Sequence, residues 1–264
     1  MTQDFLTRFA PLLRSVSEAM IRTDCTLEGR LVLARDGDFA ISWAPFDHVN
    51  LNARVVLVGL TPGRQQAANA LIAARAALLS GARPSDAARV AKEMASFSGS
   101  MRPNLIAMLD HVELNRMLGL QSSGELFANA SPLVHYTSAL RHPVLRSGGD
   151  YNGSRPTSVP ILRRMVLEHL TDEVRLLPEA VWIPLGAGAQ DALSLLADRG
   201  ILVRQRILEG LPHPSGANAE RIAYFLGRKD RAQLSAKTNP ARIDGAHEML
   251  HAKMLTLSGQ AIGG

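Results

Sequence analysis

Two short loops contain the residues best suited to chemistry. The first is Gly59-Leu60-Thr61-Pro62-Gly63 and the second is His213-Pro214-Ser215-Gly216-Ala217-Asn218. A histidine can donate or accept a proton at neutral pH, and glycine-rich loops at strand ends can bind phosphate through backbone N–H groups. Either loop alone is well explained as a turn, or as a cap in which Ser215 or Asn218 begins a helix near Ala219. Because each follows an apolar run typical of a strand, the two loops together predict a functional site.

The elements that position these loops are predicted from hydrophobic patterns. The run Val55-Val56-Leu57-Val58 precedes the first loop and is typical of a strand buried on both faces. Four strands are predicted, at about 55–58, 126–129, 180–186 and 201–207. Helical patterns lie between them, at about 64–95, 103–118, 158–176 and 188–199. This alternation predicts an α/β fold, a three-layer sandwich with a central, mostly parallel four-stranded sheet, in which both loops lie at the carboxyl ends of strands.

The two ends of the chain are predicted to be additions to this core. Residues 1–20 carry apolar side chains at helical spacing, and the Asp36-Gly37 turn between two apolar runs predicts a β-hairpin. From about residue 228 the chain has a polar, helical pattern. We therefore predict a single domain over residues 1–264, with a core at about 53–226, an N-terminal addition at 1–52 and a C-terminal helical extension at 227–264.

The composition limits the class of protein. Of 264 residues 46% are hydrophobic, yet no run reaches the ~18 apolar residues of a membrane helix, so we expect a cytoplasmic protein without membrane contact. The single cysteine, Cys25, excludes an internal disulfide and any four-cysteine metal site, so we expect chemistry without a metal or other cofactor. A net charge of +5 and a pI near 9.9 favour a polyanionic partner such as nucleic acid, although a GC-rich coding genome explains the arginine-rich composition equally well.

Taken together, the two loops resemble the paired active-site motifs of the uracil-DNA glycosylase superfamily, most closely those of its mismatch-specific and single-strand-selective branches. The resemblance covers roughly residues 53–226, with a helical insertion between Gly63 and Phe97. It implies a monofunctional DNA glycosylase that flips a uracil or C5-modified pyrimidine out of the DNA. Such an enzyme hydrolyses the N-glycosidic bond and leaves an abasic site.

The resemblance also implies roles for individual residues. His213, held between Pro212 and Pro214, is expected to donate a hydrogen bond to O2 of the departing pyrimidine. Phe97 is expected to supply the aromatic floor of the base pocket, and Asn129, at the end of its predicted strand, the amide that reads the base. The remaining expected base-binding residues are Gly59, Leu60 and Gly63. The second motif and its neighbours are expected to bind DNA through Pro62, Pro214, Ser215, Gly216, Asn218 and Arg221.

Two positions depart from the family pattern. Thr61 stands where related enzymes carry an Asp or Asn that positions the attacking water, and threonine cannot act as a general base. Asp150, in the glycine-rich loop 147–151, is a candidate for the missing carboxylate, although an exposed loop aspartate is the more common explanation of such a residue. Gly63 replaces the tyrosine with which the uracil-specific branch closes the C5 side of the base. We therefore expect the pocket to admit 5-substituted pyrimidines.

Further DNA contacts are predicted from Arg141 and Arg146, near the Asp150 loop. No apolar wedge follows Ser215, which favours single-stranded or already distorted DNA as the partner. The sequence makes no prediction about protein partners.

Three alternatives stay open at this stage. The enzyme could be a defence glycosylase that excises hypermodified cytosine from phage DNA, or the fold could be a non-catalytic nucleic-acid-binding module, which Thr61 permits. A nucleotide- or sugar-phosphate-binding α/β enzyme is a more distant third alternative, because the chain has no Gly-x-x-x-x-Gly-Lys-Ser/Thr loop.

Overall fold

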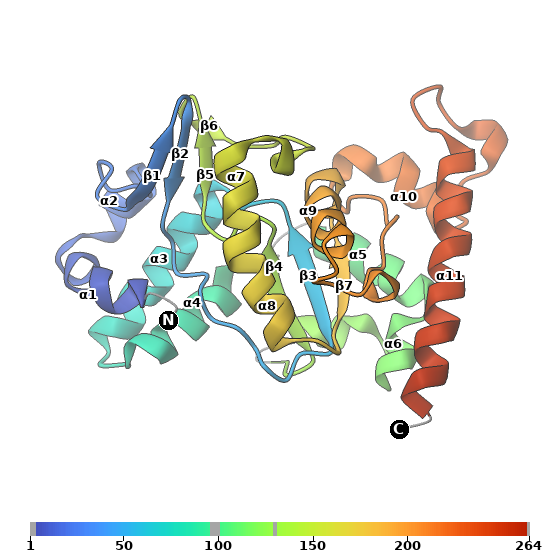
Figure 1. The fold of residues 1–264 in the computed structure, drawn as a ribbon, viewed down its shortest axis with the longest axis horizontal. Coiled ribbons are helices and arrows are strands. Elements are labelled where there is room, and N and C mark those ends of the chain that lie inside the picture. The colour runs from blue at the N-terminus through green and yellow to red at the C-terminus, as the bar shows by residue number, and fades with distance from the viewer. Residues whose placement is uncertain (1–3, 96–100, 129–130, 263–264) are drawn as a thin grey trace.

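The computed structural model describes residues 4–95, 101–128 and 131–262. Its centre is a parallel three-stranded sheet in the order β4 (Val134–Ser138), β3 (Val55–Gly59) and β7 (Val181–Pro184) (Figure 1). The predicted α/β class is confirmed, but among the described residues the parallel sheet has three strands rather than the predicted four. At the fourth position, only Ile207 forms a bridge, to Trp182 of β7, and Arg204–Arg206 is a 3-10 helix.

The second strand was also misplaced by the sequence patterns. Ser123–Phe127 forms a 3-10 helix, whose Leu126 is fully buried, and the true strand β4 begins at Val134. A short apolar run does not distinguish a strand from a buried helical turn. β4 is an edge strand with alternating apolar and polar residues, so its pattern is weaker than that of a strand buried on both faces.

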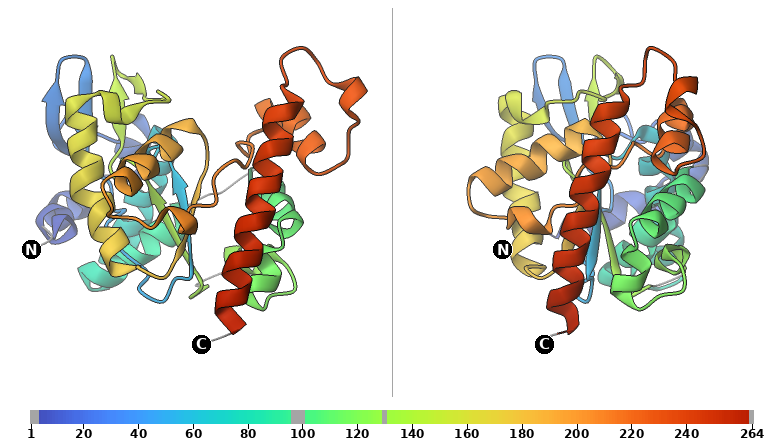
Figure 2. Two further views of the ribbon diagram at one scale, coloured as in Figure 1. Left: turned by 45° about the vertical axis from the view of Figure 1, so that its right-hand side comes forward. Right: turned by 90° about the vertical axis from the view of Figure 1, so that its right-hand side faces the viewer.

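Helices cover both faces of the parallel sheet, as the two views in Figure 2 show. Val56 and Val58 of β3 belong to a core shared with α7 (Pro160–Met165), α8 (Thr171–Leu176) and α9 (Ala187–Asp198). Val55 and Leu57 point to the opposite core, which α5 (Met101–His111), α6 (Leu114–Leu118), α10 (Ala219–Phe225) and α11 (Pro240–Ile262) complete. Because successive strand residues face opposite sides, the continuous apolar run of β3 fills both cores.

Two of the predicted helices are interrupted. The pattern at 64–95 forms α3 (Arg64–Leu79) and α4 (Pro84–Ala95), because Gly81 adopts a φ of +89° and Pro84 begins the second helix. The pattern at 158–176 is continuous only through a π-helical turn at Val166–Leu170, between α7 and α8. The N-terminal pattern forms α1 (Phe5–Ser15) and α2 (Glu18–Thr23).

The N-terminal segment is built into the body of the molecule. The predicted hairpin is confirmed as β1 (Val32–Asp36) and β2 (Phe39–Ser42), but β2 also pairs with β5 (Val144–Arg146), and β5 with β6 (Gly149–Asp150). α1 packs on α3 and α4 through a separate apolar core. The backbone N–H of Ser42 donates to the Pro143 carbonyl, so the segment after β2 begins just beyond the carboxyl end of β4. No helix among the described residues is long and apolar enough to cross a membrane.

Candidate active site

A cavity of about 180 Å³ lies where β3 and β4 end. Its described lining comes from both predicted loops and from segments distant in sequence. These residues are Phe46, Gly59, Leu60, Thr61, Pro62, Gln66, Lys92, Met101, Tyr136, Thr137, Ser138, Arg141, Leu185, His213 and Pro214. No aspartate or glutamate is among them. The fold thus brings the two loops together around a space whose described side chains carry no negative charge.

His213 is held in the cavity wall in one tautomer. The backbone N–H of Ser215 donates to its Nδ1 over 3.3 Å, and because an N–H can only donate, the ring proton lies on Nε2. Asn104 of α5 steadies the loop by donating from Nδ2 to the Pro214 carbonyl over 2.9 Å. Burial lowers the pKa of the His213 ring. His213 is therefore a neutral Nε2–H donor at pH 7.

Gly186, which follows β7, leaves room for this ring. Its φ of +100° is unfavourable for other residues, and a Cβ added to it would lie 3.0 Å from Cδ2 of His213. The glycine is required both by its own backbone and by the position of the imidazole.

Thr61 lines the cavity, but its hydroxyl is already hydrogen-bonded to two backbone groups. Its hydroxyl donates to the carbonyl of His142 and accepts from the N–H of Val144, each over 3.1 Å. A hydroxyl has one proton and two lone pairs, so one lone pair stays available for a water molecule. Thr61 can hold a water but cannot take its proton.

Asp150 lies outside the cavity lining, on the far side of the first loop. Its Oδ1 accepts from the backbone N–H of Arg64 over 3.1 Å and pairs with the Arg64 guanidinium at 3.3 Å, which places the carboxylate at the positive end of α3. Its Oδ2 lies 3.2 Å from where a Cβ on Gly63 would stand. Gly63 likewise borders this helix start rather than the cavity, so the structure does not bring these two predicted residues to His213.

Comparison with known proteins assigns the chain to a family. The family model of the Uracil DNA glycosylase superfamily matches residues 46–236. The chain belongs to this superfamily. "Uncharacterized protein YoxB" of Bacillus subtilis (strain 168) is 32% identical over 247 residues, which cover 92% of this chain and 96% of that protein. No solved structure gives a significant match.

Membership of the superfamily supports a DNA glycosylase-type function and a DNA substrate. Two residues for which the superfamily resemblance predicts roles in base recognition, Phe97 and Asn129, lie outside the described residues. Besides β3, the strand that ends at the cavity is β4, which contributes Tyr136, Thr137 and Ser138. These three residues were missed because the strand itself was misplaced.

Sequence reasoning also missed other cavity residues outside the motif loops, among them Phe46 and Lys92. Phe46 comes from the segment after β2 and supplies an aromatic ring that is 6% exposed. Lys92 comes from α4, in the insertion between the two motifs, and is 4% exposed. The only signal for Lys92 is its place among four lysines in an arginine-rich chain, beside the buried Ala91 of α4. The N-terminal segment and the insertion therefore complete the site.

The structure does not favour a surface DNA contact at Arg141, which lines the cavity instead. This side chain is 4% exposed, and its guanidinium donates to Oε1 of Glu173 over 2.7 Å and to the carbonyl of His169 over 3.2 Å. A buried carboxylate requires a partner, and Arg141 supplies it. The sequence could not indicate this, because Glu173 lies more than thirty residues away, in α8.

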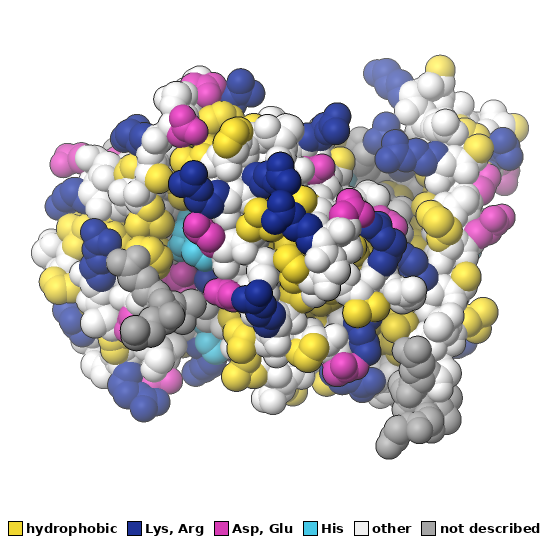
Figure 3. Space-filling view, in the orientation of Figure 1, with side chains coloured by type: hydrophobic (Ala, Val, Ile, Leu, Met, Phe, Trp, Pro, Cys, Tyr) yellow, Lys and Arg dark blue, Asp and Glu magenta, His cyan; other side chains and the backbone are white. Residues whose placement is uncertain are grey.

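Of the other predicted DNA contacts, Arg146 and Arg221 are exposed, whereas Pro62 and Pro214 are buried in the cavity wall. Arg146 pairs with Asp38 at 2.7 Å, and Arg221 donates to Oδ1 of Asn218 over 3.0 Å. Asn218 in turn donates to Oγ of Ser215 over 3.1 Å, which ties the second motif to the Arg221 face. Gly216 begins a 3-10 turn at Gly216–Asn218. On the face in Figure 3, lysine and arginine side chains are interspersed with acidic ones rather than gathered into one block.

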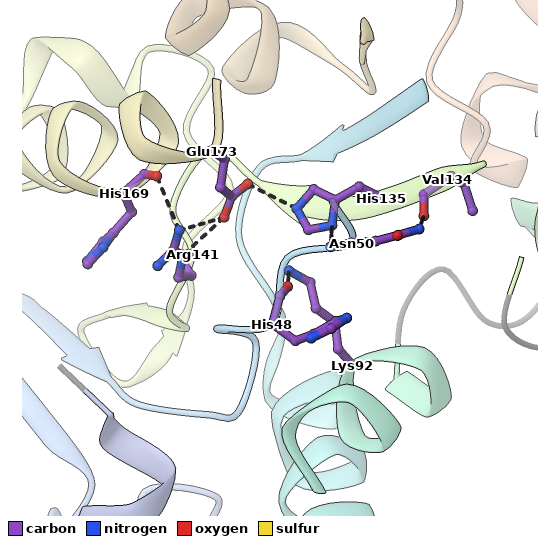
Figure 4. A network of polar contacts seen from close by, with 8 residues as sticks. All are labelled: His48, Asn50, Lys92, Val134, His135, Arg141, His169 and Glu173. Carbon is purple, nitrogen blue, oxygen red and sulfur yellow. Dashed lines mark hydrogen bonds and ion pairs between the residues drawn. The ribbon is translucent and has the colours of Figure 1, made fainter. Parts of the chain in front are cut away.

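A buried polar network lies behind the cavity (Figure 4). His135 of β4 contacts Oε2 of Glu173 through Nε2 at 3.3 Å, and Arg141 pairs with the same carboxylate. Burial lowers the pKa of His135 to about 4, whereas Arg141 holds the pKa of Glu173 well below its ordinary value against the opposing effect of burial. Lys92 approaches this network from α4 and donates to the carbonyl of His48 over 2.6 Å. In the parts of the chain that the structure describes, no group of three or more His, Cys, Asp or Glu residues could hold a metal ion.

Proposed function

We propose that this chain is a monofunctional DNA glycosylase that hydrolyses the N-glycosidic bond of a flipped-out uracil or C5-modified pyrimidine and leaves an abasic site. The proposal rests mainly on one observation: His213 is a neutral Nε2–H donor in a cavity that is also lined by the first motif loop. Cleavage leaves negative charge on the base, and a fixed donor stabilises such charge most where water is excluded. Loss of one such donor typically reduces the rate by ~10²–10³-fold.

The attacking water is held rather than activated. The C1′–N1 bond breaks as the oxygen of water bonds to C1′, and the proton released by the water passes to solvent or to the departing base. Thr61 has one lone pair free to accept a hydrogen bond from that water, and the described cavity lining holds no carboxylate. We therefore assign most of the rate to stabilisation of the leaving base and expect slow turnover.

The substrate proposed is a pyrimidine in single-stranded or distorted DNA. Excision of 5-substituted pyrimidines as well as uracil is proposed from the family pattern, in which Gly63 replaces a tyrosine; Gly63 itself borders the start of α3 and is not part of the described cavity lining. Removal of deaminated bases and removal of modified pyrimidines from foreign DNA both fit this pocket. A substrate panel separates the two roles.

The test is release of bases from single- and double-stranded oligonucleotides that contain uracil, 5-hydroxymethyluracil or modified cytosines, read as strand cleavage after alkali. We expect release by the wild-type protein and a loss of at least ~100-fold in His213→Ala with little change in DNA affinity. His251→Ala is the matched control, because His251 is a partly buried histidine of α11 outside the cavity lining. Full activity of His213→Ala would contradict the proposal.

A second candidate is a non-catalytic DNA-binding module of the same fold. It is favoured by the hydroxyl of Thr61, which is engaged with the backbone, and by the lack of a carboxylate in the described lining. Binding of the oligonucleotides without release of any base, at any enzyme concentration, would establish this candidate instead.

A further inference from the structure

Lys92 is a buried cation with no carboxylate beside it. Its side chain is 4% exposed, and within the described part of the chain its ammonium has one hydrogen-bond acceptor, the carbonyl of His48 at 2.6 Å, and no acidic oxygen within 4.0 Å. An ammonium has three donor hydrogens. Two of them therefore have no described protein acceptor.

In the cavity, these two ammonium hydrogens can reach an acceptor on a bound ligand. Lys92 lines it together with Arg141 and His213. Arg141 is already paired, because its guanidinium binds the Glu173 carboxylate and the His169 carbonyl. Lys92 is thus the one lining cation, among the described residues, that is not neutralised by a carboxylate of the protein.

Lys92 and His213 approach the cavity from opposite edges of the sheet. The segment that carries His48 runs along the outer edge of β4, because Asn50 donates to the Val134 carbonyl over 2.8 Å, and Lys92 binds this segment. His213 follows Ile207, which bridges to β7 at the other edge. A base between them would meet a donor from each side.

We propose that Lys92 is a specificity-determining residue of the base pocket, whose ammonium donates to the oxygen at C4 of the excised pyrimidine while His213 donates to the oxygen at C2. This inference rests on the proposed function, whose pocket it deepens. A 4-oxo pyrimidine such as uracil offers an acceptor at C4. Cytosine presents an amino group there, and because an ammonium only donates, both groups would lose their partners. Base selection would then depend on a residue of the insertion rather than on an amide alone.

The surroundings of Lys92 allow its charge to be removed within an accessible pH range. Burial lowers its pKa to about 8, with Arg141 acting in the same direction, while Glu173 and Asp47 oppose the shift. The imidazoles of His48 and His135 are neutral at pH 7, because their pKa values are also lowered. Arg89 and Glu93, also on α4, are charged groups that act on the neighbouring His48.

The test measures binding, so that it does not depend on turnover. The probes are single-stranded oligonucleotides with one 2′-fluoro-2′-deoxyuridine or one 2′-fluoro-2′-deoxycytidine, whose glycosidic bonds resist hydrolysis. We expect the wild-type protein at pH 7 to bind the uridine probe about 10- to 100-fold more tightly, the range typical of a hydrogen bond to a charged group. Lys92→Met should lose this preference.

Two further variants exclude a merely structural role. Lys253→Met is the matched control, because Lys253 is a partly buried lysine of α11 that also donates to a backbone carbonyl, that of Ile207, over 2.7 Å. It should keep the preference. The preference of the wild-type protein should weaken as the pH rises from 7 to 9.5, whereas Lys92→Arg, whose charge persists at that pH, should keep any preference that it shows at pH 7.

The outcomes distinguish a failure of the proposed role of Lys92 from a failure of the proposed function. A Lys92→Met variant with the wild-type preference, or a wild-type protein that binds both probes equally, overturns the role of Lys92. Failure of the wild-type protein to release any base from ordinary substrates overturns the proposed function alone, because the binding preference and its loss in Lys92→Met would still establish the donor in the pocket.

Discussion

Replacement of Lys92 by methionine should make the protein more stable while it abolishes base discrimination. In the folded protein the pKa of this ammonium is about 8, against 10.5 for an unperturbed lysine. The unfolded chain therefore holds the proton more firmly than the folded one. At 1.36 kcal/mol per pKa unit, the buried charge costs about 3 kcal/mol of stability at pH 7.

The sign of the pH dependence follows from these two values. Below pH 8 both states are protonated and the full cost is present. Between pH 8 and 10.5 the folded state loses its proton first, so the cost shrinks, and above 10.5 it is absent. Methionine removes the cost at neutral pH but leaves the His48 carbonyl without its donor, which costs about 1 kcal/mol or more.

The expected net gain for Lys92→Met is on the order of 1–2 kcal/mol at pH 7, which corresponds to a rise in Tm of about 2–8 °C. It should be measured by urea unfolding at pH 7 and again near pH 10.5, where the advantage should disappear. Lys253→Met, which removes a partly buried lysine that pairs with Glu209 over 3.6 Å, should show no such gain. A clear loss of stability in Lys92→Met at pH 7 would refute the reasoning, because it would mean that the ammonium contributes net favourable contacts in the free protein.

Three other predictions concern the framework of the site. Gly186→Ala should lower activity at least ~10-fold and cost about 1–3 kcal/mol of stability, because the backbone φ of +100° and the ring of His213 both oppose a Cβ; an unchanged rate would show that the imidazole position is not critical. Stability should fall as the pH drops from 6.5 towards 4, because the pKa of His135 is lowered to about 4 and the unfolded chain takes up its proton first; urea titrations across this range that show no change would contradict the burial of a neutral ring. Arg141→Met should destabilise the fold by about 3–5 kcal/mol by leaving Glu173 unpaired, and a surface-like effect below 0.5 kcal/mol would mean that this pair is not buried.

The sequence was most informative where a local pattern has only one structural solution. The Asp36-Gly37 hairpin and the β3 strand followed by its glycine-rich loop formed as predicted, because turn chemistry and continuous burial are encoded by adjacent residues. The edge strand β4 was missed for two reasons. An edge strand needs apolar residues at fewer positions, and the apolar run in the neighbouring 3-10 helix at Ser123–Phe127 gave a stronger strand pattern.

The site was predictable for the residues of the two motif loops and unpredictable for those supplied by other elements. Arg141 was assigned to DNA from its charge, whereas its role depends on Glu173, a partner that no local spacing reveals. Phe46 and Lys92 reach the cavity only because β2 pairs with β5 and α4 packs beside the segment that follows β2. Such contacts arise from tertiary packing, which a single sequence does not display.

The two proposals share one physical basis, which is charge on the departing base. A site with an acidic residue beside the water can accelerate its attack, but the described lining of this cavity contains donors and one unpaired cation, with no acid. Donors aimed at the base lower the energy of the anion that cleavage produces, and they do so at both carbonyl positions only if the base is a 4-oxo pyrimidine. Under the proposed function, selection of the base and acceleration of its release would therefore be the same interaction, and the cost of keeping Lys92 charged in the folded protein would be recovered only in the presence of the correct base.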